Sequence, residues 1–291
     1  MDKTLISILG GLGGMFGWGT SDFFANQASD TVGHIRAFFW SQIAGLVLMG
    51  LAALIFSGGL SFTLPMAILI IVTGVSYALG YLYFYNGFEI GNVSVVSAVI
   101  NLQTLFIIAI SYFVYKQSLT TFQIPALILL LAGIILVSVN FQDLKGGGVS
   151  LVKGVKETII AAILFGALFW PLNEYVVERV DWSAASFAVK LVAIIFVLLV
   201  SKITSKNLTL PKSLSGKDKK IIVAVGLLEA LAVISVSYGV SVGDAIIVAP
   251  IASALTVVTV TMAMIFLKEK LTKTQGWGII LTIMGIILTG F

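Results

Sequence analysis

Cysteine is absent from this 291-residue sequence, and histidine occurs once, as His34. Without cysteine there can be no disulfide framework, thiolate metal site or cysteine nucleophile. A single histidine cannot assemble a histidine-based metal site or catalytic constellation. The sequence also lacks a glycine-rich phosphate loop followed by Lys-Ser/Thr, which argues against an ATP-driven mechanism. We therefore expect no metal, no cofactor and no enzymatic activity.

Charge is equally scarce. Charged residues make up 10% of the chain, hydrophobic residues make up 59%, and the mean hydropathy is +1.10. A soluble globular protein has roughly a quarter charged residues, so the composition predicts a multi-pass membrane protein of the inner or plasma membrane. The net charge of +4 lies in short loops and indicates membrane orientation, not nucleic-acid binding.

Ten segments are apolar and long enough to cross a membrane, which needs about 20 residues each. The predicted fold is therefore an all-α integral membrane protein with ten transmembrane helices. The expected spans are 5–27, 35–56, 64–88, 93–115, 122–140, 158–177, 183–201, 220–241, 245–267 and 274–291.

One stretch occurs twice. Residues 268–272 repeat residues 116–120, and Gly285 repeats Gly133, both at an offset of 152 residues. The same offset carries Gly87 onto Gly239, Gly91 onto Gly243 and Trp18 onto Trp170. The chain is therefore predicted to be a duplication, with a first repeat at 1–145 and a second at 150–291.

Each predicted repeat has five helices, an odd number, so the two copies should insert with opposite orientation. Inverted repeats place their substrate site at the interface, near the middle of the membrane. Most lysines and arginines fall in the odd-numbered loops, and the positive-inside rule then puts those loops in the cytoplasm and both termini outside.

Motifs in three places carry a family resemblance. They are Phe16-Gly17-Trp18-Gly19 in the first span, Ala249-Pro250 in the ninth, and Leu267 to Thr272 followed by Gly276 and Gly285. With the ten spans and the duplication, these motifs make the chain resemble the EamA-type members of the drug/metabolite transporter superfamily. The resemblance covers essentially the whole chain. It implies a transporter whose helices one, three, four, six, eight and nine surround a central cavity.

The chain departs from the family pattern in its first repeat. Ala98 and Gln117 stand there where the second repeat has Pro250 and Glu269. Members of the family usually keep both termini in the cytoplasm, whereas the charge count puts them outside. Both orientations therefore stay open.

An acidic residue, Glu229, lies near the middle of the eighth span. An ionised carboxylate there is costly, so the side chain should face protein or water and not lipid. We predict that Glu229 couples transport to protons or is a counter-ion for a cationic substrate. The alternative is a neutral carboxyl group hydrogen-bonded to a neighbouring helix.

Two further acids, Asp22 and Glu174, are related by the same offset, and each lies four residues after the tryptophan of its repeat. Each is followed early in the next span by a cation, Arg36 or Lys190. We predict ion pairs between Asp22 and Arg36 and between Glu174 and Lys190. Such pairs either gate the transporter or only hold the helices together.

The third span places Tyr77, Tyr81 and Tyr85 on one helical face, and Tyr77 corresponds to Glu229 under the repeat. This face either packs or helps to bind an aromatic or cationic solute by stacking and cation–π contact.

Pro171 and Pro250 are expected to kink the sixth and ninth helices, since each removes an amide donor. The other predicted cavity-lining residues are Trp18, Trp170, Asn101, Gln103 and Ser253.

These features predict a secondary active transporter, an exporter or exchanger, for small organic metabolites such as amino acids or organic cations. It would work by alternating access around a central cavity, with protons as a candidate coupling ion. The alternative is a flippase or scramblase for lipids or lipid-linked substrates. The expected partners are the small-molecule substrate and membrane lipids, for a chain that acts as a monomer or homodimer. Neither the substrate's identity nor the direction of transport follows from the sequence.

Overall fold

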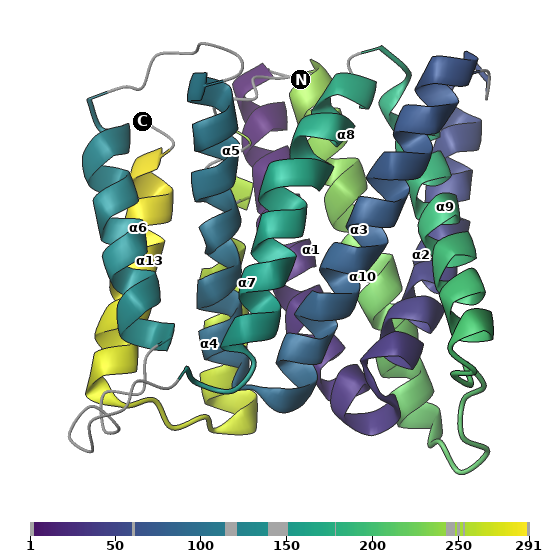
Figure 1. Ribbon diagram of the computed structural model, residues 1–291. Helices are drawn as coiled ribbons and strands as arrows, with labels where there is room; N and C mark the ends of the chain where they lie inside the picture. The colour runs from purple at the N-terminus through teal and green to yellow at the C-terminus, as the bar shows by residue number, and fades with distance from the viewer. Residues whose placement is uncertain are drawn as a thin grey trace.

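The computed structural model describes residues 3–59, 62–113, 121–138, 151–177, 179–242, 248, 251–252 and 254–289, and its helices run side by side (Figure 1). Described in order, the first half contains α1 (Lys3–Val32), α2 (His34–Phe56) and α3 (Leu64–Ile90). They are followed by α4 (Val93–Val99), the 3₁₀ segment η1 (Ile100–Leu102), α5 (Gln103–Phe113) and α6 (Gln123–Ser138). The segments α4, η1 and α5 follow one another without a break, so they form one helical rod.

The second half repeats this order. It contains α7 (Val155–Ile163), the π-helical segment η3 (Leu164–Phe169), α8 (Trp170–Val177), α9 (Trp182–Ile203) and α10 (Gly216–Val242). The described helices that follow are α12 (Leu255–Met262), the π-helical segment η4 (Ala263–Leu267) and α13 (Lys273–Thr289). The predicted boundary between the repeats, at residues 145–150, lies outside the described residues.

Apolar length confirms the membrane class. Among the described residues, α2, α3, the α7–α8 rod, α9 and residues 216–239 of α10 are each long and apolar enough to cross a membrane. Shorter apolar helices accompany them. Large apolar side chains on these helices are exposed, for example Leu54 at 83% and Ile203 at 82%. Such a surface suits lipid and not water.

Reciprocal contacts relate α6 and α13, which lie side by side (Figure 1). Gly133 packs so closely on α13 that a Cβ atom there would stand 2.5 Å from the amide nitrogen of Thr282. Gly285 packs on α6 in the same way, 2.7 Å from the amide nitrogen of Leu130. The 152-residue offset exchanges Gly133 with Gly285 and Leu130 with Thr282. Such exchange of partners is what a twofold-related pair of helices produces.

Glu269 joins the two halves at a helix end. Its carboxylate accepts hydrogen bonds from the backbone amides of Val93 and Ser94, at 2.7 and 3.1 Å, and from the Ser94 hydroxyl at 2.6 Å. These amides open α4 and have no partner within the helix, and a negative charge is favourable at a helix N-terminus. The repeated motif at 268–272 thus contributes a cap for a helix of the first half.

Candidate functional site

Glu229 lies in α10 where this helix crosses α2 closely. Its side chain is buried, with 2% of the residue exposed. One turn earlier, Gly226 touches the backbone of α2, and a Cβ atom at Gly226 would stand 1.8 Å from the carbonyl oxygen of Ser41. Only glycine allows this approach, which places Gln42 of α2 beside the same polar cluster as Glu229.

Four side chains from four helices form this cluster, which we call the Glu229 cluster: Gln42 of α2, Tyr77 of α3, Lys190 of α9 and Glu229 of α10. The ammonium group of Lys190 donates to Glu229 Oε2 and, at 2.6 Å, to Gln42 Oε1. The Tyr77 hydroxyl donates to Glu229 Oε1 at 2.9 Å and lies 3.1 Å from Gln42 Oε1. Both carboxylate oxygens of Glu229 therefore have a partner.

The Glu229 cluster is buried as a whole, since Lys190 is 3% exposed, Tyr77 6% and Gln42 0%. A buried ion pair offsets its desolvation cost only if its remaining polar atoms are also satisfied. One atom is not: the side-chain amide nitrogen Nε2 of Gln42 has no partner among the described residues. In the described part of the structure, the four side chains of the cluster are thus almost out of contact with solvent.

A second acid lies near the cluster. Asp22 of α1 is buried, and its carboxyl group is near enough to Glu229 for the two charges to repel. No hydrogen-bond donor from the described part of the chain is found on the Asp22 carboxyl group. Among the described residues, the buried centre therefore brings together the ammonium group of Lys190 and the carboxyl groups of Asp22 and Glu229, of which Glu229 is paired.

Aromatic rings lie against the cluster at Tyr77, whose ring centroid is 5.2 Å from that of Phe169 and 6.2 Å from that of Phe38. Tyr81 stacks on Phe38 with ring centroids 5.6 Å apart, and its ring centroid lies 4.6 Å from that of Tyr77. Trp18 and Trp170, equivalent under the repeat, meet edge to face with centroids 6.5 Å apart. Both of these arrangements are favourable geometries for aromatic pairs.

The two predicted amides have different roles. Gln103 Oε1 accepts a hydrogen bond of 3.2 Å from the indole nitrogen of Trp170 and so lies beside that ring. Asn101 is buried and donates to the carbonyl oxygen of Ser97 and to the Thr256 hydroxyl, both at 2.9 Å. Its amide nitrogen thus connects the η1 segment to α12, which is a packing role.

Of the two predicted proline kinks, Pro171 falls on a described helix. It directly follows the first residue of α8, and the chain before it widens into the π-helical segment η3. Proline has no amide hydrogen and its ring crowds the carbonyl group four residues earlier, so a wider turn relieves the clash. Pro250 and Ser253 lie outside the described residues.

The predicted pair of Asp22 with Arg36 is corrected. Arg36 donates instead to the carbonyl oxygens of Asn207 at 2.9 Å and Val32 at 3.2 Å. The expected span ended near residue 27, but α1 continues to Val32, where Gly33 with φ of 83° allows the reversal. Asp22 therefore lies about 15 Å along the helix from the turn at a rise of 1.5 Å per residue, while Arg36 lies beside that turn.

The predicted pair of Glu174 with Lys190 is corrected for a similar reason. Glu174 is exposed near the end of α8, whereas Lys190 is buried about 12 Å into α9, eight residues after its start. Lys190 pairs with Glu229 instead. Gln42 was not among the predicted site residues, although a side-chain amide within an apolar span itself indicates a functional or packing position.

Comparisons with known proteins agree with this architecture. The sequence model of the EamA-like transporter family matches residues 5–139 and again 157–291. A search of curated proteins gives no match. A crystal structure of a protein that is 15% identical covers 97% of this chain and 96% of its own, with a TM-score of 0.67. This likeness concerns the fold alone.

Proposed function

Because the chain belongs to the EamA-like transporter family, a family of membrane transporters, we propose that it is a secondary active transporter that moves small organic metabolites by alternating access. The observation that carries this proposal is the buried pair of Lys190 and Glu229, which lies beside the ring of Tyr77. Intramembrane charges are costly and are kept where they act on a substrate or ion.

The architecture proposed with it is ten spans in two inverted repeats. The reciprocal contacts of α6 and α13 support a twofold relation between the halves. So do two further pairs of equivalent residues that meet, Trp18 with Trp170 and Tyr77 with Glu229. A residue that contacts its own equivalent lies on the axis that relates the repeats. That axis would pass through the Glu229 cluster, where an inverted-repeat transporter binds its substrate.

The charges of the cluster favour a zwitterion such as an amino acid, with organic cations as the other class. When the helices around the cluster separate, the ion pair between Lys190 and Glu229 breaks. A bound zwitterion restores both partners, its carboxylate taking Lys190 and its ammonium group taking Glu229. The free amide nitrogen of Gln42 offers one more donor to the carboxylate. Tyr81, Trp18 and Trp170 would then contact the substrate's side chain.

Protons are the proposed coupling ion, with Asp22 and Glu229 as their sites. The two carboxyl groups repel each other, and among the described residues Lys190 supplies the ammonium group that pairs with one of them. A proton on either group removes this repulsion, so binding of a proton and binding of the substrate's ammonium group compete for the same negative charge. Competition of this kind would make the protein an exchanger or exporter driven by a proton gradient.

Flux measurements in proteoliposomes test the function. We expect saturable counterflow of a radiolabelled neutral amino acid. Its rate should be higher when the lumen of the proteoliposomes is more acidic than the medium than when the two have the same pH. Redistribution of labelled phospholipid between leaflets with no solute flux would instead favour a flippase. The charge argument would be overturned if no amino acid or organic cation of a test panel gave counterflow while a sugar was transported.

A further inference from the structure

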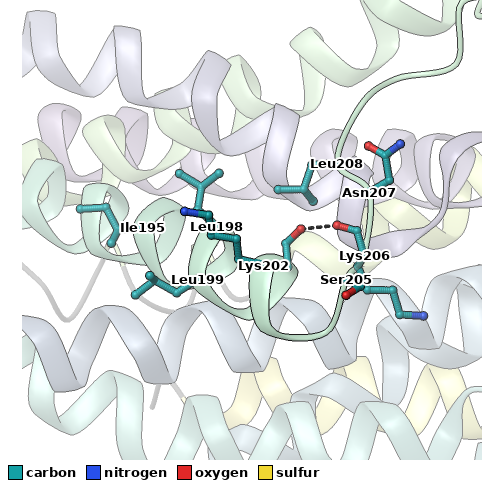
Figure 2. A pocket seen from close by; sticks show the side chains of 9 residues that line it. Ile195, Leu198, Leu199, Lys202, Ser205, Lys206, Asn207 and Leu208 are labelled. Atoms are coloured by element: carbon teal, nitrogen blue, oxygen red, sulfur yellow. Dashed lines mark hydrogen bonds between the residues drawn. The ribbon is translucent and has the colours of Figure 1, made fainter.

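A groove of about 580 Å³ opens on the surface of the protein where α9 ends, and none of its lining residues belongs to the Glu229 cluster (Figure 2). Its apolar wall is formed by Ile195, Leu198 and Leu199 of α9, and its polar end by Lys202, Lys206 and Asn207. We call it the Lys202 groove. Its size is within the range of sites that bind small molecules, roughly 300–1,000 Å³.

The polar end of the Lys202 groove is fixed by hydrogen bonds. Ser205 has a φ of 53°, so the chain turns back directly after α9. The Lys206 amide then donates to the Ser201 carbonyl oxygen at 2.9 Å, and the Ser201 hydroxyl donates to the Lys206 carbonyl oxygen, drawn dashed in Figure 2. Asn207 is held to α2 through Arg36. A loop bonded at both sides keeps the lysines in place.

The groove lies at the expected boundary of the membrane. α9 is apolar and long enough to cross, and Lys202 belongs to its last turn. The three apolar side chains lie one to two turns earlier and are 45–55% exposed, as lipid-facing side chains are. The groove thus runs from the hydrocarbon region into the headgroup region, where lysine side chains reach phosphate.

The charged side chains that line the Lys202 groove are positive. The groove has two lysines among its lining residues and no acid. Figure 2 shows Lys202 lying back along α9 beside Leu198, while Lys206 extends from the other side of the loop. The two flexible stems therefore frame the polar end and can both turn onto one anion. Lysines that only set membrane orientation would not need an apolar groove beside them.

We propose that the Lys202 groove binds an anionic glycerophospholipid. The phosphate group meets the ammonium groups of Lys202 and Lys206, the amide of Asn207 contacts the headgroup, and one acyl chain lies along Ile195, Leu198 and Leu199. A lipid held there ties the end of α9 to the loop that Arg36 anchors to α2. Since α9 also carries Lys190, the lipid stabilises the helix that supplies the cation of the Glu229 cluster.

Native mass spectrometry of the purified protein, with dioleoyl phosphatidylglycerol or dioleoyl phosphatidylcholine added, tests this site. The parent should retain one phosphatidylglycerol preferentially. The variant K202A/K206A should bind it about thirtyfold more weakly, as expected when two lysines near a lipid surface are removed. The control K217A/K219A removes the same charge from the start of α10 and should bind as the parent does.

A further variant and a competing ligand identify which part of the lipid the groove recognises. Leu198→Asn should weaken retention of the lipid, and glycerol 3-phosphate, which has the headgroup chemistry without acyl chains, should displace it poorly. Equal weakening by K217A/K219A would show a general positive field and overturn the proposal. So would retention by K202A/K206A at the parent's level, or full displacement by glycerol 3-phosphate, which would indicate a site for a soluble phosphate.

Discussion

Tyr77 and Glu229 occupy the same position in the two repeats of the sequence, and the hydroxyl of one donates a 2.9 Å hydrogen bond to the carboxylate of the other. Two residues that are equivalent under the 152-residue offset are thus in direct contact. A symmetric pair of acids at this place would repel, because like charges in a low-dielectric interior interact strongly. A tyrosine in one copy avoids this conflict and gives the carboxylate of the other copy a donor on one side and Lys190 on the other.

Removing either charge of the central pair should cost stability. Glu229→Gln leaves the Lys190 ammonium group buried without its counter-ion, and Lys190→Met does the same to Glu229. Breaking a buried pair from one side costs about 3–5 kcal/mol of the free energy of unfolding. Thermal unfolding in detergent should therefore show a large fall in Tm for both single variants.

The double variant K190M/E229Q provides the control for this prediction. It leaves neither charge unpaired, and replacing both partners of a buried pair is often neutral for stability. We expect its Tm to lie close to that of the parent. A double variant no more stable than the single ones would show that the two side chains do not act as a pair.

Gly226→Ala should disrupt the crossing of α10 with α2. Its Cβ atom would stand 1.8 Å from the Ser41 carbonyl oxygen, a backbone atom that cannot turn aside. Gly276→Ala is the matched control, since no atom lies within 4 Å of a Cβ atom there. Alanine in that helix should be neutral or stabilising by about 0.5–1 kcal/mol. Equal yields of folded protein from both variants would contradict the close crossing.

Glu269→Gln should weaken the attachment of α4. The substitution replaces a charged acceptor of three hydrogen bonds by an amide, at a helix N-terminus where negative charge is favourable. We expect a loss of about 1–2 kcal/mol, comparable to removal of a helix cap. Hydrogen exchange should show faster exchange of the Val93 and Ser94 amides. The control Glu157→Gln, an acid with no role in this cap, should leave these amides protected.

Asp30→Asn should raise stability at neutral pH and not at low pH. Burial, and then repulsion by Glu89, raises the pKa of Asp30, which lies in the last turn of α1 outside the expected span. With a raised pKa in the folded state, the ionised form destabilises the fold fully at pH 7. This cost disappears as the pH falls through the folded pKa toward the ordinary value. The Tm gain of the variant should therefore shrink between pH 7 and pH 4, and a constant gain would contradict it.

Much of the fold could be predicted because its signals are local. Apolar length located the helices, and the offset of 152 residues made Tyr77 the equivalent of Glu229. The offset also brought Trp18 and Trp170 into correspondence, and the two rings meet. An apolar helix and a repeated sequence both follow from residues near one another in the chain, so they can be recognised without coordinates.

The ion pairs could not be predicted because they depend on how far along its helix each charged residue lies. Lys190 was paired with Glu174 on sequence proximity, but the rise of each helix puts these two residues at different levels. The partner of Lys190 is 39 residues away on α10, and α2 packs against both α9 and α10. The partners of Gln42 could not be predicted for the same reason, since they meet it only where the helices cross, although its amide within an apolar span was itself a signal.

The most direct test of the account is the initial rate of amino-acid counterflow in proteoliposomes containing K190M/E229Q, compared with the parent and with Glu157→Gln. If the pair binds the two ends of a zwitterion, the double variant folds but loses two charge-assisted contacts to the substrate. Its rate should then fall by roughly a hundredfold or more, while Glu157→Gln stays at the parent's rate. A folded double variant that transports at the parent's rate would show that the Lys190–Glu229 pair only holds α9 to α10.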